Sequence, residues 1–128
     1  MSNDFWQELL ANTSPCGKYL KHGETLLMCK LKENNILKVR EIVSLNPFEA
    51  NKTAKFLCSL ADKHEITITG TASPFLIGPS VTKNNSFLKG LSLEKLLKWY
   101  KYYGFEAYLE EDGKYTVIRR AKKWMLKL

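Results

Sequence analysis

The chain has 128 residues, of which 45% are hydrophobic, and its 20 Lys and Arg residues outnumber 13 Asp and Glu residues to give a net charge of +7. This length and apolar content predict one domain, residues 1–128, with a core of its own. No apolar run reaches the roughly 20 residues of a membrane span, and the first residues lack the order of a signal peptide, so we expect a soluble, cytoplasmic protein without membrane contact. The positive charge suits an anionic partner.

The three cysteines, Cys16, Cys29 and Cys58, are widely spaced and include no Cys-x-x-Cys pair. This spacing predicts neither a disulfide framework nor a zinc site, and we expect no metal.

The first predicted element is a short helix over residues 5–10, where apolar residues follow helical spacing and Asp4 suits the N-cap. Pro15 and Gly17 then interrupt regular structure, and we expect residues 19–23 to form a loop.

Two β-rich segments follow, residues 25–31 and 36–45, with Glu33-Asn34-Asn35 as a turn between them. This pattern predicts an antiparallel hairpin. Its second strand carries Lys38 and Arg40 on one face.

A helix is predicted over residues 51–63, and the alternation of residues 65–70 predicts a strand directly after it. Strand, helix and strand then form a βαβ unit, which requires one parallel pair. The many Pro, Gly and Asn residues in 71–91 indicate an exposed loop.

The clearest helix begins after Ser92 and ends before Gly104, and its apolar stripe includes Leu93, Leu96 and Tyr100. Two strands, residues 105–109 and 114–120, then flank an Asp112-Gly113 turn, and residues 121–128 form a basic tail. We therefore predict an α/β fold, a mixed, mostly antiparallel sheet flanked by helices with one parallel βαβ unit.

This order of elements, together with Tyr100 and the Gly104-Phe105 pair that closes the helix, resembles the GNAT superfamily of N-acetyltransferases over residues 36–121. The chain is similar to compact, divergent members of that family found in phage and bacterial genomes. The resemblance implies an acetyl-CoA-dependent transferase that acylates an amine.

In that family acetyl-CoA lies where two parallel strands separate, and its pyrophosphate is held by a Gly-rich loop at the start of the next helix. The resemblance places the cofactor against Val43 and Leu45 and in the loop 46–53. Within that loop it assigns cofactor binding to Asn51, Lys52 and Thr53. The two glycines of the family's loop are absent here, whereas Asn51 tolerates positive φ and Lys52 carries charge.

Tyr100 stands at the family's position for the tyrosine that protonates the departing thiolate. Its place on the apolar stripe equally suits a core residue. Glu41 is the candidate general base, and an ion pair with Lys38 or Arg40 is the other interpretation of this carboxylate.

The end of the chain is strongly basic. Arg119, Arg120, Lys122 and Lys123 can contact a nucleic acid or an acidic protein, or can protect a sheet edge from aggregation. The alternative function is therefore a catalytically inactive GNAT-fold module that binds an anionic partner.

Overall fold

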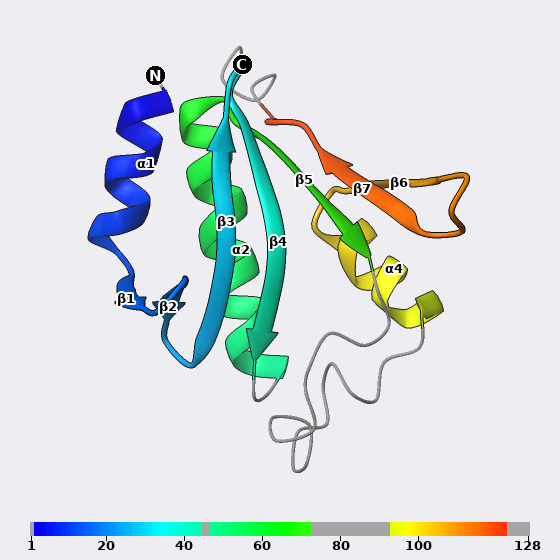
Figure 1. Ribbon diagram of the computed structural model, residues 1–128, viewed down its shortest axis with the longest axis horizontal. Helices are drawn as coiled ribbons and strands as arrows, with labels where there is room; N and C mark the ends of the chain where they lie inside the picture. Colours follow the sequence, from blue (N-terminus) through cyan, green and yellow to red (C-terminus); the bar gives the residue numbers. More distant parts are fainter. Residues whose placement is uncertain (1, 45–46, 73–92, 123–128) are drawn as a thin grey trace.

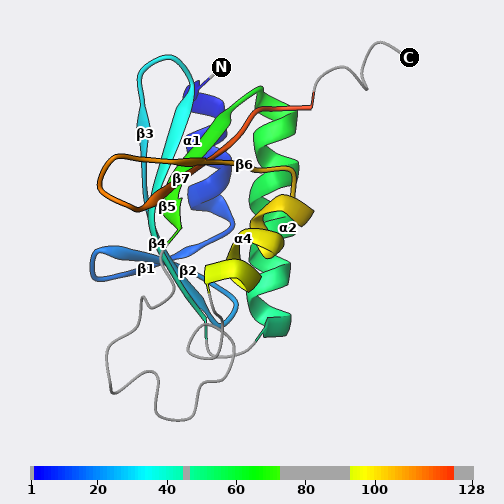
Figure 2. The ribbon, with the colours of Figure 1, turned by 90° about the vertical axis from the view of Figure 1, so that its right-hand side faces the viewer.

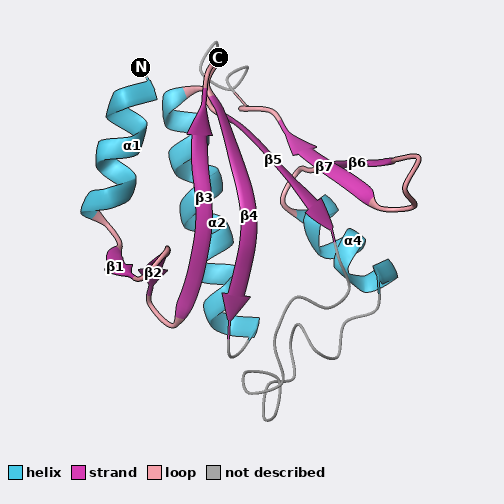
Figure 3. Ribbon diagram, in the orientation of Figure 1, coloured by secondary structure: helices cyan, strands magenta, loops and turns pink. Residues whose placement is uncertain are grey.

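The computed structural model describes residues 2–44, 47–72 and 93–122, and it confirms an α/β fold (Figures 1 and 3). The elements are α1 (Ser2–Ala11), β1 (Ser14–Cys16), β2 (Tyr19–His22), β3 (Thr25–Lys32), β4 (Ile36–Ser44), α2 (Pro47–His64), β5 (Thr67–Ala72), α4 (Leu93–Tyr102), β6 (Glu106–Leu109) and β7 (Tyr115–Arg119). The strands form one sheet in the order β1-β2-β3-β4-β5-β7-β6. Among the described strands only β4 and β5 pair in parallel, so the predicted mixed, mostly antiparallel sheet is confirmed.

The loop predicted for residues 19–23 is wrong, because residues 19–22 form β2, which pairs antiparallel with β1. Gly17 adopts a φ of 61°, a left-handed conformation that a glycine takes without strain, and so allows a tight turn between the two short strands. Pro15 lies on an edge strand, where a missing N–H group is tolerated.

The predicted hairpin of β3 and β4 is confirmed, with Asn34 and Asn35 in left-handed turn conformations. The pairing shifts within this hairpin. Met28 lies opposite Glu41 and Cys29 lies opposite Val39, which leaves Arg40 in a bulge without a cross-strand partner.

Helix α2 begins at Pro47, four residues before the predicted start. Proline suits the first turn of a helix because its missing N–H group has no helical partner there. Residues 47–50, expected as part of a loop, are therefore helical. The predicted strand after the helix is β5, and the helix between β4 and β5 confirms the parallel βαβ unit.

Helix α4 and the β6–β7 hairpin are confirmed. Gly104 closes α4 with a φ of 96°. The loop predicted for residues 71–91 lies outside the described residues except for its first two, which belong to β5, and most of the basic tail also lies outside them.

All the helices among the described residues lie on one side of the sheet (Figure 2). The core forms between these helices and the sheet, where Phe5 and Leu9 of α1 meet Leu57 of α2 and Leu37 of β4. The strand residues that alternate with these buried positions face away from the helices. The opposite face of the sheet is therefore helix-free among the described residues.

Candidate functional site

Strands β4 and β5 separate partway along their length. Their parallel register runs from Ile36↔Thr67 to Val39↔Gly70 and ends there. Beyond this point β4 continues to Ser44, whereas β5 continues beside β7. Figure 1 shows the two strands leaving the same end of the sheet and diverging. We call the region between them beyond Val39 and Gly70 the inter-strand opening.

An apolar pocket lies on the helix side of this opening. Its cavity volume is about 30 Å³, which is room for about one or two water molecules. Residues from both strands and both neighbouring helices line it, among them Val39, Ile42, Leu57, Ile68, Trp99 and Tyr100. The pocket is thus small and hydrophobic.

Tyr100 lines the apolar pocket from α4. Its ring contacts the rings of Trp99 and Phe105 edge-on, with 5.2 Å between ring centroids in each pair. Among the described residues its hydroxyl makes no hydrogen bond, and burial raises its pKa to about 12. Tyr100 therefore packs against its aromatic neighbours and also lines the pocket, and its catalytic role stays a prediction.

Glu41 does not join Tyr100. Its neighbour Ile42 packs into the core, so the alternation of β4 places Glu41 on the helix-free face. There the Tyr19 hydroxyl donates a hydrogen bond to its carboxylate at 2.6 Å. This bond is the main reason that the pKa of Tyr19 is raised. No ion pair joins Glu41 to Lys38 or Arg40 in the described ranges, so that alternative is wrong in this structure.

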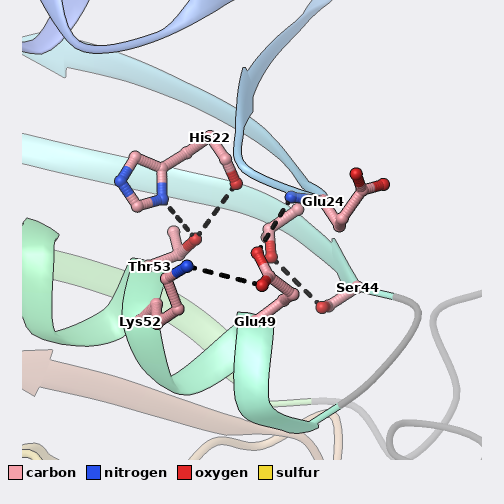
Figure 4. Close-up of polar contacts among 7 residues, drawn as sticks. His22, Glu24, Ser44, Glu49, Lys52 and Thr53 are labelled. Atoms are coloured by element: carbon pink, nitrogen blue, oxygen red, sulfur yellow. Dashed lines mark hydrogen bonds and ion pairs between the residues drawn. The ribbon is translucent and has the colours of Figure 1, made fainter.

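The start of α2 holds a carboxylate, as Figure 4 shows. Glu49 accepts a hydrogen bond from the backbone N–H of Glu24 at 3.1 Å and lies 3.5 Å from the Lys52 ammonium. The bond from Glu24 is the main reason that the pKa of Glu49 is lowered. A negative charge already lies at the positive end of the helix dipole, where the resemblance implies a pyrophosphate.

The other predicted loop residues have structural partners. Asn51 accepts hydrogen bonds from Trp99 Nε1 at 2.8 Å and from the Tyr103 hydroxyl at 2.7 Å, and so joins α2 to α4. Thr53 is buried, and its hydroxyl lies 2.7 Å from His22 Nδ1 (Figure 4). Both residues lie within the helix rather than in a phosphate-binding loop.

The remaining two residues assigned to the cofactor belong to the end of β4. Val43 is half-buried and lies opposite Leu26 of β3. Leu45 lies outside the described residues.

The basic C-terminal residues that the structure describes, Arg119, Arg120 and Lys122, do not form one surface. Arg119 is 3% exposed, and its guanidinium donates two hydrogen bonds to the Asp62 carboxylate at 2.9 and 3.0 Å. This pairing removes Arg119 from any contact with a partner and corrects that assignment. Arg120 pairs with Glu106 at 3.4 Å, Lys122 is exposed, and Lys123 lies outside the described residues.

Comparison of the chain with protein-family models, with curated proteins and with solved structures finds no match. The GNAT resemblance therefore depends on this chain's own residues and geometry. Within the described ranges no helix is long and apolar enough to cross a membrane. The same residues include no group of three or more His, Cys, Asp or Glu side chains that could hold a metal ion.

A second cavity, for which the sequence carried little signal, lies on the other side of the inter-strand opening from the apolar pocket. An open groove of about 620 Å³ includes Lys32, Lys38 and Arg40, and it shares Val39 and Gly70 with the apolar pocket. The position of Lys38 and Arg40 on one face of a predicted strand was its only sequence signal. We call this feature the basic groove.

Proposed function

We propose that the chain is a GNAT-like, acyl-CoA-dependent N-acyltransferase that transfers an acyl group to an amine. One observation carries this proposal: the parallel strands β4 and β5 separate beyond Val39 and Gly70, and Tyr100 lines a pocket at that opening. In the family that the sequence resembles, the thioester lies in an opening of this kind.

The backbone of β4 supports the binding of the pantetheine arm. Past Val39, the edge of β4 that faces β5 has no strand partner among the described residues. Backbone N–H and C=O groups need partners, and an extended ligand can supply them as an added strand would. The amide groups of pantetheine have the chemistry for this pairing.

Tyr100 supports the chemical step as a hydrogen-bond donor. The amine nitrogen attacks the thioester carbonyl, the C–N bond forms, the C–S bond breaks, and the thiolate leaves while the amine releases its proton to water. A phenol of pKa about 12 stays protonated at neutral pH. Because a thiol has a pKa of about 8.5, full proton transfer from this phenol is unfavourable. Tyr100 therefore acts by donating a hydrogen bond to the sulfur as its negative charge develops.

The proposal assigns different surroundings to the two parts of acetyl-CoA. The separated strands suit the pantetheine arm, whereas Glu49 occupies the helix end at which a diphosphate would bind. The cavity of about 30 Å³ is also too small for a thioester. Binding in the pocket therefore requires side chains that line it to move, and the proposal does not use the diphosphate as the main anchor.

A second candidate is a catalytically inactive domain that binds an anionic partner. The observation that favours it is the Glu49 carboxylate at the start of α2, in place of a glycine-rich phosphate loop. Lys122 is exposed, and Arg120 is exposed as well although it pairs with Glu106 at 3.4 Å, so both can contact such a partner.

Calorimetric titration with acetyl-CoA and with S-acetylpantetheine distinguishes these candidates. The transferase proposal predicts heat of binding with both ligands and similar affinities, because the diphosphate adds little. Release of free thiol in the presence of a panel of amines then measures transfer. Absence of heat with both ligands at millimolar concentration would overturn the proposal and leave the binding module.

A further inference from the structure

The basic groove lies on the helix-free face of the sheet. Lys38 of β4 and Thr69 of β5 are register partners, and both alternate with buried core residues, Leu37 and Ile68. The volume of the groove, about 620 Å³, lies within the range of small-molecule sites, which is about 300–1,000 Å³.

One wall of the groove is positively charged. Lys32 and Lys38 belong to β3 and β4, and Arg40 occupies the bulge of β4. Lys30 lies directly opposite Lys38 in the register and adds a fourth cation to the same face. All four side chains are exposed, and none forms an ion pair with another described residue.

Such a cluster is unfavourable without an anion. Like charges directly opposite each other on paired strands repel and destabilise the sheet. Protection of a sheet edge does not explain Lys38, because this residue is paired with Lys30 of β3 on one side and with Thr69 of β5 on the other. The nearest carboxylate along β4, that of Glu41, accepts a hydrogen bond from the Tyr19 hydroxyl and forms no ion pair with these cations among the described residues.

The other wall is uncharged and carries hydroxyl groups. Thr69 and Thr71 of β5 and Thr116 of β7 line it. Thr71 and Thr116 are register partners, so their side chains lie side by side on one face. Hydroxyls donate and accept hydrogen bonds and therefore suit the polar, uncharged part of a ligand.

We propose that the basic groove binds a small phosphorylated molecule of about the size of a mononucleotide. Lys32, Lys38 and Arg40 hold its phosphate, and the threonines bind its sugar-like or polar body. The groove and the apolar pocket share Val39, Thr69 and Gly70, so they lie on two sides of the same opening. The role of this ligand as the amine acceptor rests on the proposed transferase function. Binding of the ligand to the groove does not depend on that function.

Calorimetric titration of the full chain with AMP tests this site without any thioester. Adenosine, which lacks the phosphate, is the control ligand. We expect AMP to bind at least tenfold more tightly than adenosine. A difference of this size corresponds to roughly one or two charge-assisted hydrogen bonds to the phosphate. Lys38→Gln and Arg40→Gln should each weaken AMP binding by about fivefold to tenfold, with a larger loss in the double variant. Lys55→Gln, an equal loss of charge at an exposed position on α2, should leave the affinity unchanged.

Three outcomes would overturn the proposal. The first is equal binding of AMP and adenosine, or no binding of AMP at millimolar concentration. The second is a loss in Lys55→Gln equal to that in Lys38→Gln, which would show a diffuse effect of net charge. The third is binding of a short single-stranded DNA in the absence of AMP binding, which would indicate a nucleic-acid surface instead. Circular dichroism of each variant checks that it is folded.

Discussion

Gly70 approaches the backbone of Val39 so closely that a Cβ atom on Gly70 would lie 3.0 Å from the Val39 carbonyl oxygen. These two residues form the last parallel pair before β4 and β5 separate. The glycine therefore permits a close contact at the point from which the inter-strand opening begins.

Gly70→Ala should destabilise the protein. The added methyl group pushes β5 away from Val39, and this strain exceeds the small entropic gain of replacing glycine, so we expect a loss of about 1–2 kcal/mol in the free energy of unfolding. Urea denaturation measures this loss. Thr71→Ala, an exposed change one residue further on, serves as the control and should cost less. Equal stability of Gly70→Ala and wild type would show that the close contact carries no constraint.

Asp62→Asn should be the most damaging of these substitutions for the fold. It removes the charge that balances the buried Arg119 guanidinium, whose side chain is only 4% exposed, while Asp62 is 29% exposed. An uncompensated buried charge of this kind costs about 3 kcal/mol. The denaturation midpoint should fall accordingly, while Glu111→Gln, at an exposed position, should leave it unchanged. A loss of unfolding free energy smaller than that of an ordinary surface substitution would contradict the interpretation of Arg119 as a structural cation.

His22 should make stability depend on pH between about pH 7 and pH 5. Partial burial lowers the pKa of this imidazole, the Lys52 charge lowers it further, and Glu49 opposes the shift. The folded state therefore favours the neutral ring. Its stabilising contribution is complete above the unfolded-state pKa of about 6.5 and is lost as the pH falls below that value.

Urea unfolding at pH 7 and pH 5 checks this expectation. Wild type should lose more stability over this interval than His22→Gln, which has no imidazole at this position. The ring also stacks on Phe56 at 4.5 Å between centroids, so the variant is less stable at both pH values. Parallel losses in the two proteins would exclude His22 as the source of the pH dependence.

The sequence predicted those elements whose signals are local. Helix α4 and the β3–β4 and β6–β7 hairpins follow from an apolar stripe, Asn or Gly turns and a closing glycine. The β1–β2 hairpin was missed because all three residues of β1 are exposed and show no alternation. The early start of α2 was missed because Pro47 and Glu49, both suited to a first helical turn, were assigned to a phosphate-binding loop.

The site was harder to predict than the fold, because its partners are distant in sequence. Asp62 lies 57 residues before Arg119, and nothing near Arg119 indicates that its charge is buried. Similarly, Asn51 reaches Trp99 across 48 residues, so its structural role is visible only in the folded chain. The position of Tyr100 on the apolar face of α4 was predictable because helical spacing is a local property, and its catalytic role stays a prediction.

Tyr100→Phe separates packing from chemistry. The ring keeps its contacts with Trp99 and Phe105, and the hydroxyl that is removed has no hydrogen-bond partner among the described residues. We therefore expect the free energy of unfolding to change by less than about 1 kcal/mol. If the phenol stabilises the departing thiolate, kcat should fall by about tenfold to a hundredfold with little change in KM. Unchanged kcat would remove Tyr100 from the chemistry.

The most direct test of the central claim follows the backbone amide signals and the tryptophan indole N–H signals of the protein by NMR during titration with acetyl-CoA. Binding in the inter-strand opening predicts shifts that cluster in residues 39–44 of β4, at Gly70 and at the Trp99 indole. Shifts confined to the helix-free face, or none at millimolar ligand, would contradict an acyl-CoA site between β4 and β5.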